Sequence, residues 1–99
     1  MTYNYETIIN GKRIKFEDIE DEPLLFEMIL TPNYRLYRDI CPDYPFERWI
    51  LHHSYTDIIN GKPERRLFKY DVYNGKNIEN ETFLNELLIH VIEGAGIKL

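Results

Sequence analysis

The sequence predicts an α+β fold: an antiparallel sheet from two β-hairpins, at about residues 3–17 and 48–73, packed by two helices at about 22–30 and 81–93. Three observations support it. The octet YETIINGK at residues 5–12 returns at 55–62 as YTDIINGK, with six identical positions. Alternating apolar and polar residues flank both copies. Two further apolar segments carry the residues that begin and end helices.

The first hairpin is predicted from Asn10-Gly11, the preferred centre of a type I′ turn because both residues tolerate positive φ. A two-residue loop places Ile9 opposite Lys12 and Tyr5 opposite Phe16. One face of the hairpin is then largely apolar, and we expect it to lie on the core. That face carries Tyr5, Thr7, Ile9, Ile14 and Phe16.

The segment at residues 22–30 is predicted to be a helix. Pro23 suits a first helical turn, the preceding acids suit the positive end of a helix, and Pro32 lies just beyond its end. Its apolar side chains form two stripes on nearly opposite sides. The second stripe, Phe26 and Leu30, is expected to be buried or to contact a partner.

The second hairpin is predicted from strand-like composition at residues 48–59 and 65–73. Pro63 is expected to lengthen its loop, because proline cannot donate a backbone hydrogen bond. Residues 34–40 also favour a strand, and Asn74-Gly75 indicates another turn.

The last helix, at residues 81–93, has a broad apolar stripe, Asn80 as its N-cap and Gly94 as its left-handed stop. Each half of the chain then reads as a hairpin followed by a helix, a ββα pseudo-repeat. The shared octet arises either by ancestral duplication or, more simply, by convergence on a favourable turn.

Composition indicates a single cytoplasmic domain. The 99 residues leave no room for two cores, the apolar runs are short for a membrane helix, and we expect no secretory signal. The single cysteine, Cys41, cannot form an internal disulfide. The net charge of −5 disfavours direct binding of nucleic acid, because phosphates repel a negative protein. Frequent Ile, Asn, Lys and Tyr suggest an AT-rich genome, that of a low-GC bacterium or its phage.

His52-His53 suggests a metal site or a general base, but neighbouring strand residues point to opposite faces and cannot bind one metal ion. We therefore expect no metal, no cofactor and no catalytic residue. A small enzyme or ligand-binding domain that uses His52 or His53 with Tyr55 and Asp57 is the alternative, and an open cleft at His53 would favour it.

Two clusters are predicted to contact a protein partner. One is an acidic run and the other a group of aromatic and basic side chains, residue types that are enriched at binding hot spots. The acidic run consists of Glu17, Asp18, Glu20, Asp21 and Glu22. The second cluster consists of Tyr34, Arg35, Tyr37 and Arg38.

These features predict a small acidic protein-binding module, a regulator or inhibitor from a phage or mobile element. Its target would be a host protein such as a nucleic-acid enzyme, with an anti-CRISPR-like inhibitor as one instance. The other alternative is a homodimer that associates through a sheet edge or through the Phe26 and Leu30 stripe.

Overall fold

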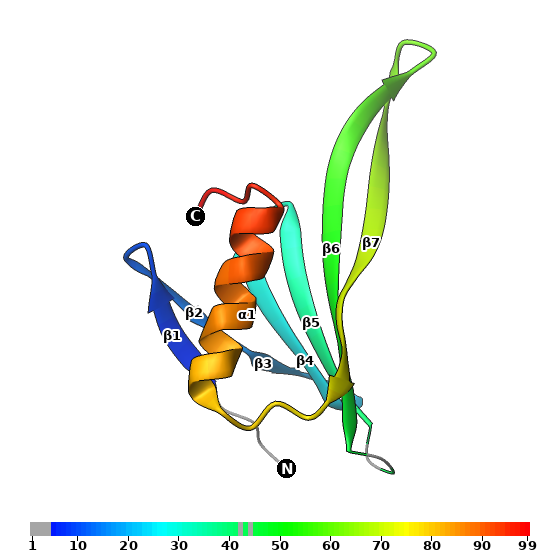
Figure 1. The fold of residues 1–99 in the computed structure, drawn as a ribbon. Coiled ribbons are helices and arrows are strands. Elements are labelled where there is room, and N and C mark those ends of the chain that lie inside the picture. Colours follow the sequence, from blue (N-terminus) through cyan, green and yellow to red (C-terminus); the bar gives the residue numbers. More distant parts are fainter. Residues whose placement is uncertain (1–4, 42, 44) are drawn as a thin grey trace.

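The computed structural model describes residues 5–41, 43 and 45–99, which form two antiparallel sheets and a C-terminal helix (Figure 1). Strands β1 (Glu6–Ile9) and β2 (Lys12–Lys15) make a two-stranded sheet. The five-stranded sheet has the order β3-β4-β5-β6-β7. Its strands are β3 (Glu17–Ile19), β4 (Glu22–Thr31), β5 (Tyr34–Ile40), β6 (Phe46–Ile59) and β7 (Lys62–Lys76), and α1 (Glu81–Gly94) follows them.

The predicted register of the first hairpin is confirmed. Ile9 pairs with Lys12 and Thr7 with Ile14, around a turn in which Asn10 and Gly11 both have positive φ. The amide of Phe16 donates to the carbonyl of Tyr5, which extends the pairing by one step. Residues 3 and 4 of the predicted range lie outside the described residues. Tyr5, Ile14 and Phe16 are buried, as the apolar face requires.

The predicted helix at 22–30 is wrong, because this segment is strand β4. The apolar residues that would form two stripes on a helix also fit a strand, in which alternate side chains share one face. Phe26, Met28 and Leu30 face the core and are buried, whereas Ile29 on the other face is exposed. Pairing with β3 on one side and β5 on the other decides between the two periodicities. The stripe of Phe26 and Leu30 is therefore interior, and it does not form the predicted dimer interface.

Because this segment is a strand, the predicted ββα pseudo-repeat is wrong, and so is the prediction that two helices cover the sheet. Among the described residues, α1 is the one helix, and the first hairpin forms a sheet of its own. The strand predicted at 34–40 is confirmed as β5. Asn74-Gly75 does not turn, because β7 continues to Lys76.

Pro63 does not lengthen the second turn. Asn60 and Gly61 both have positive φ, as in the first hairpin, and Ile59 pairs directly with Lys62. Pro63 opposes Ile58, one step beyond the pair that closes the loop. In such a two-residue hairpin this is a non-hydrogen-bonded position, so the missing N–H of Pro63 would have pointed away from β6.

Helix α1 begins at the predicted cap, because the Asn80 side chain accepts hydrogen bonds from the amides of Thr82 and Phe83. Its end differs from the prediction. Gly94 is the last helical residue, and Gly96 supplies the positive φ. The helix buries an apolar stripe against the sheet and the first hairpin. The buried members are Leu84, Leu88, Val91 and Ile92.

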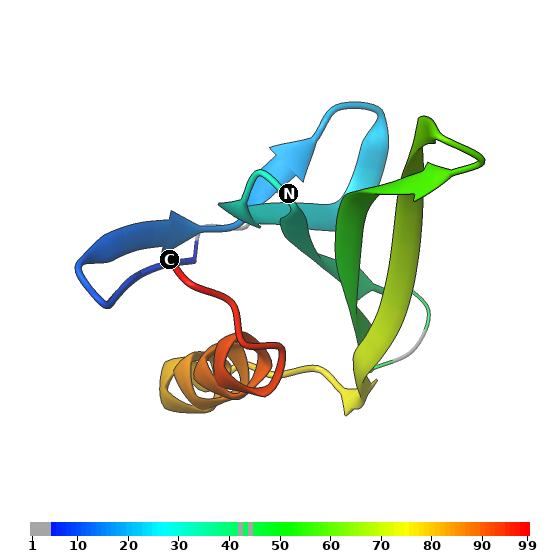
Figure 2. The same ribbon diagram turned by 90° about the horizontal axis from the view of Figure 1, so that it is seen from above.

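The first hairpin closes the core on the side of α1 away from β6 and β7, as the two views show (Figure 2). The ring of Phe16 meets Trp49 edge-on, with centroids 5.2 Å apart. The Tyr5 hydroxyl donates to the Asn85 side chain on α1, and Lys12 donates to the carbonyl of Leu30 on β4. These contacts connect the first hairpin to β6, α1 and β4.

Candidate functional site

The outer part of the β6–β7 hairpin, residues 53–70, extends past the C-terminal end of α1 and is here called the arm (Figure 1). At the base of the hairpin, Trp49 and Leu51 are buried beneath the helix. On β7 every residue from Lys62 to Asp71 is exposed. A 14-residue helix is about 21 Å long, whereas 14 strand residues span roughly 46 Å, so α1 cannot cover the whole hairpin.

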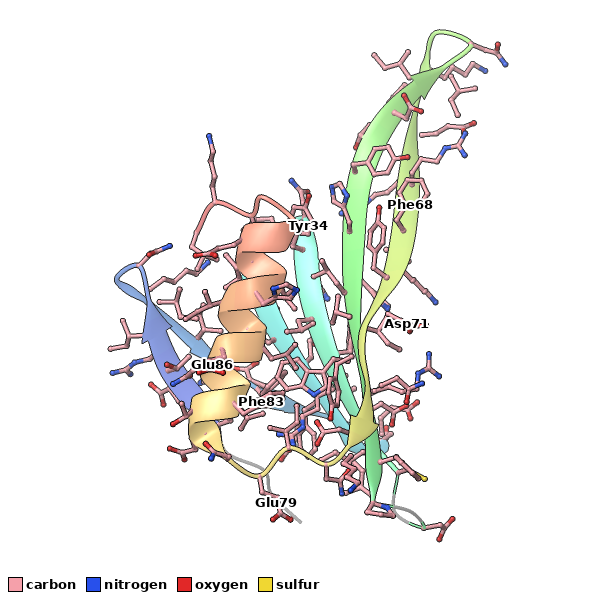
Figure 3. The ribbon with its side chains drawn as sticks, in the orientation of Figure 1. Tyr34, Phe68, Asp71, Glu79, Phe83 and Glu86 are labelled. Atoms are coloured by element: carbon pink, nitrogen blue, oxygen red, sulfur yellow. The ribbon has the colours of Figure 1, made fainter. Side chains whose placement is uncertain are left out.

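The arm exposes large apolar side chains on both of its faces. Ile58 and Leu67, with exposed fractions of 73% and 53%, lie on the face away from α1. Phe68 and Tyr70, with exposed fractions of 49% and 47%, lie on the face that continues from Leu51. Figure 3 shows Phe68 on the arm beyond the end of the helix. An exposed apolar surface of this kind is a candidate for an interaction site.

A series of aromatic rings runs along the inner face of the arm and onto β5. Tyr34 stacks on His53, with centroids 4.2 Å apart and planes 7° from parallel. Tyr55 stacks on Phe68 at 5.5 Å, and Phe68 meets Tyr70 at 6.1 Å. The cross-strand pairs Tyr34 with His53 and His53 with Phe68 place these side chains on one face. Contacts between the rings stiffen the outer part of the β6–β7 ribbon, where every β7 residue from Lys62 to Asp71 is exposed.

The arm also differs in charge from the rest of the chain. Its four cations, Lys62, Arg65, Arg66 and Lys69, exceed its two carboxylates, Asp57 and Glu64, which gives the arm a formal charge of +2. The whole chain carries −5, so the remainder carries −7. The arm is therefore apolar and basic, whereas the remaining residues, here called the body, are acidic.

A cleft of about 520 Å³ lies where the arm joins the body. Tyr34, His53 and Tyr70 line one side, and His90, Gly94 and Ala95 on or beside the end of α1 line the other. Figure 3 shows Tyr34 close to this end of the helix. His53 therefore reaches an open cleft, which is the feature expected of the ligand-binding alternative.

The two neighbouring histidines point to opposite faces, as predicted. His52 packs beside Tyr37, with ring centroids 4.4 Å apart, on the face away from α1. Burial lowers the pKa of His52, and the charge of Lys69 on β7 lowers it further. Tyr55 and Asp57, which the sequence grouped with the histidines, are not among the residues that line the cleft.

Arg35 and Tyr37 form a polar cluster with Glu27 on the outer face of the sheet. Both side chains donate to Glu27 Oε1, Arg35 at 3.0 Å and Tyr37 at 2.9 Å. Burial raises the pKa of the Tyr37 hydroxyl, and the hydrogen bond to Glu27 adds to this effect. Tyr34, by contrast, is on the inner face beside His53.

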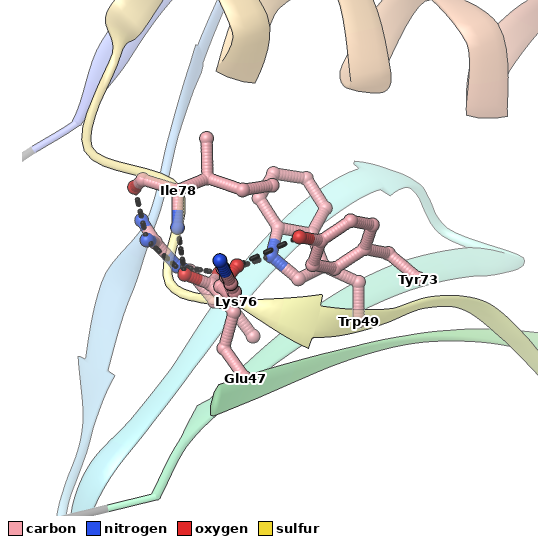
Figure 4. Close-up of polar contacts among 6 residues, drawn as sticks. Glu47, Trp49, Tyr73, Lys76 and Ile78 are labelled. Atoms are coloured by element: carbon pink, nitrogen blue, oxygen red, sulfur yellow. Dashed lines mark hydrogen bonds and ion pairs between the residues drawn. The ribbon is translucent and has the colours of Figure 1, made fainter. Parts of the chain in front are cut away.

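Arg38, predicted to contact a partner, lies in the interior. Its partner Glu47 is shown with Trp49 and Ile78 in Figure 4. The Nε of Arg38 donates to Glu47 Oε2 at 2.5 Å, and its Nη2 donates to Glu47 Oε1 and to the carbonyl of Ile78, each at 2.7 Å. The indole of Trp49 and the amide of Ile78 also donate to this carboxylate. The network ties β5 and β6 to the segment that leads into α1.

The acidic run lies at the opposite edge of the five-stranded sheet from the arm. Glu17 and Asp18 are on edge strand β3, Glu20 and Asp21 form the turn, and Glu22 begins β4; all five are exposed. The structure therefore separates the predicted partner-binding residues. The acidic run lies at this edge, Arg35 and Tyr37 lie on the outer face of β5, Tyr34 lies on its inner face, and Arg38 is buried.

Sequence reasoning missed Ile58, Leu67, Phe68 and Tyr70 as candidate contact residues. One signal of these exposed residues is present in the sequence: apolar residues occupy both faces of the predicted strands at 48–59 and 65–73. That pattern alone is ambiguous, because a strand buried on both faces has it too.

Within the described ranges, no three His, Cys, Asp or Glu side chains are grouped as a metal site would need. In that same part of the chain, no helix has the length and apolar character needed to cross a membrane. No protein-family model, no curated protein and no solved structure matches the chain.

Proposed function

We propose that the protein is a binding module that docks on another protein through the arm. The observation that carries this proposal is a two-stranded ribbon with large exposed apolar side chains on both faces. A two-stranded hairpin alone is marginally stable, and exposure of its apolar side chains to water is unfavourable in free energy. A partner that encloses the ribbon would bury Ile58 and Leu67 on one side and Phe68 and Tyr70 on the other.

The charge distribution supports a protein as the occupant. The arm is only moderately basic, and the acidic body beside it would repel a long polyanion. Aromatic, arginine and aliphatic side chains together are typical of the core of a protein interface. The role as a regulator or inhibitor of a host nucleic-acid enzyme stays a prediction from size and composition.

Addition of a strand to the free edge of β7 is a weaker explanation of the arm. This edge carries Pro63, Glu64, Arg65 and Arg66 near the tip, residues that discourage pairing with another strand. Side-chain contacts on the two faces of the ribbon therefore fit the arm better than backbone pairing along its edge.

Two phenylalanines provide a matched test. Phe68 on the arm and Phe83 on α1 have similar exposed fractions, 49% and 46%. Wild type, Phe68→Ser and Phe83→Ser would each be used to capture proteins from a lysate of the native host. We expect wild type and Phe83→Ser to retain the same partner and Phe68→Ser to lose it. Equal retention by all three would contradict docking through the arm.

Sedimentation distinguishes a second copy from a different partner. We expect wild type at micromolar concentration to sediment as a monomer. If wild type is a dimer and Phe68→Ser is a monomer, the arm binds a second copy of the chain, and the proposal of a different protein is wrong.

A further inference from the structure

The cleft between the arm and the end of α1 has the chemistry of a site for an organic cation. Three aromatic residues, Tyr34, His53 and Tyr70, line it on one side. Aromatic rings attract cations through the negative charge above their faces. The Tyr34 and His53 rings stack on each other, 4.2 Å apart and nearly parallel, so their relative orientation is set before a ligand binds.

The opposite wall also favours positive charge. Gly94 and Ala95 at the C-terminal end of α1 line the cleft, and a helix carries partial negative charge at this end. The last turn of α1 contains no basic side chain that would neutralise it. None of the described residues that line the cleft is a lysine or an arginine. The carboxylate among them, Asp71, is paired with Arg48 at 3.3 Å.

We infer that the cleft receives the guanidinium group of an arginine side chain of the protein partner. This inference rests on the proposed docking through the arm, which would bring the partner to the cleft beside it. A guanidinium is planar and stacks on aromatic faces, and its five N–H donors suit hydroxyl, imidazole and carbonyl acceptors. A lysine ammonium keeps the charge but cannot stack in the same way.

The test uses the full chain and the tripeptide acetyl-Gly-Arg-Gly-amide, followed by NMR of the histidine imidazoles at pH 8, where an ordinary imidazole is neutral. We expect saturable shifts at His53 and His90, which line the cleft. His52, on the other face of the sheet, is an internal control and should not move. The citrulline tripeptide, which has nearly the same shape without the charge, should bind at least about threefold more weakly.

A matched pair of variants locates the site. Tyr70→Leu removes a ring from the cleft, whereas Tyr55→Leu removes a ring from the same face outside it. We expect Tyr70→Leu to weaken tripeptide binding about three- to tenfold, from the usual strength of a cation–π contact. Tyr55→Leu should bind as wild type does.

Several outcomes would overturn the inference: no saturable shift, equal binding of the citrulline tripeptide, or equal shifts at His52. If methylguanidinium binds as tightly as the tripeptide, the cleft takes a free cation and not a protein side chain. If capture of the partner depends on Phe68 but the tripeptide does not bind, the arginine site is refuted and docking through the arm is not. If the tripeptide binds but capture of the partner does not depend on Phe68, docking through the arm is refuted.

Discussion

Arg38 on β5 and Glu47 on β6 form a two-point ion pair inside the protein, with donor–acceptor distances of 2.5 and 2.7 Å. Their exposed fractions are 2% and 1%. Removing one charge would leave the other buried without its partner, which is more costly than loss of the attraction itself. This pair connects the sheet to the chain entering α1 and so supports the base of the arm.

The first prediction concerns this pair. Arg38→Met should reduce the free energy of unfolding by about 3–5 kcal/mol, because the Glu47 carboxylate stays buried without a counter-charge. The double variant Arg38→Met/Glu47→Leu should be less destabilised than the sum of the two single variants. Urea unfolding followed by the fluorescence of Trp49, the one tryptophan of the chain, measures all of these variants.

Arg48→Met is the matched control, because Arg48 pairs with Asp71 at the surface, where both side chains are more than half exposed. Its cost should be at most about 1 kcal/mol. Equal costs for Arg38→Met and Arg48→Met would show that the buried network is not a structural support.

The second prediction separates the two Asn-Gly turns. Gly11→Val should cost about 1–3 kcal/mol of global stability, because valine resists the φ of +79° and this hairpin supplies Phe16 to the core. Gly61 has nearly the same φ, +77°, but lies at the tip of the uncovered arm. Gly61→Val should therefore open the tip locally, with faster amide hydrogen exchange at residues 57–64 and little change in melting temperature.

A large loss of melting temperature in Gly61→Val would contradict this separation, since it would mean that the tip and the core unfold as one unit. Unchanged exchange at the tip would instead mean that its turn does not need positive φ.

The third prediction is a pH dependence at His52. Its pKa in the folded protein is lowered, by burial and then by Lys69, while Glu27 opposes and Arg35 reinforces the shift. The unfolded chain therefore binds the proton more readily. Stability is retained above the ordinary histidine pKa of about 6.5 and is lost as the pH falls from there through the lower folded value.

His52→Gln cannot gain this proton, so its stability should fall less between pH 7.5 and pH 5 than that of wild type. Urea unfolding at the two pH values provides the comparison. Equal losses in the two proteins would show that His52 does not contribute to the acid sensitivity.

Local chemistry made several features of the fold predictable. Asn10-Gly11 specified both the turn and the register of the first hairpin, and Asn80 specified the start of α1. The segment 22–31 was not predictable in this way, because its apolar residues satisfy helical and strand periodicities alike. Its neighbours β3 and β5, which the sequence does not reveal as neighbours, decide in favour of a strand.

The candidate site was harder to predict for the same reason. The strands of the β6–β7 hairpin were predictable, but exposure of Phe68 depends on how far cover by helices extends. Among the described residues there is one helix, α1, where the sequence indicated two. Arg38 shows the converse. Its residue type suggested a surface contact, whereas the position of Glu47 across the sheet places it inside.

The central claim is that the arm touches the partner, and site-specific photo-crosslinking in the native host tests it most directly. Benzoylphenylalanine would replace Phe68 in one variant and Phe83 in another, two positions of nearly equal exposure on the arm and on α1. We predict that position 68 forms a covalent adduct with one host protein and that position 83 forms none with it. An adduct of that protein at position 83 and none at position 68 would contradict the claim.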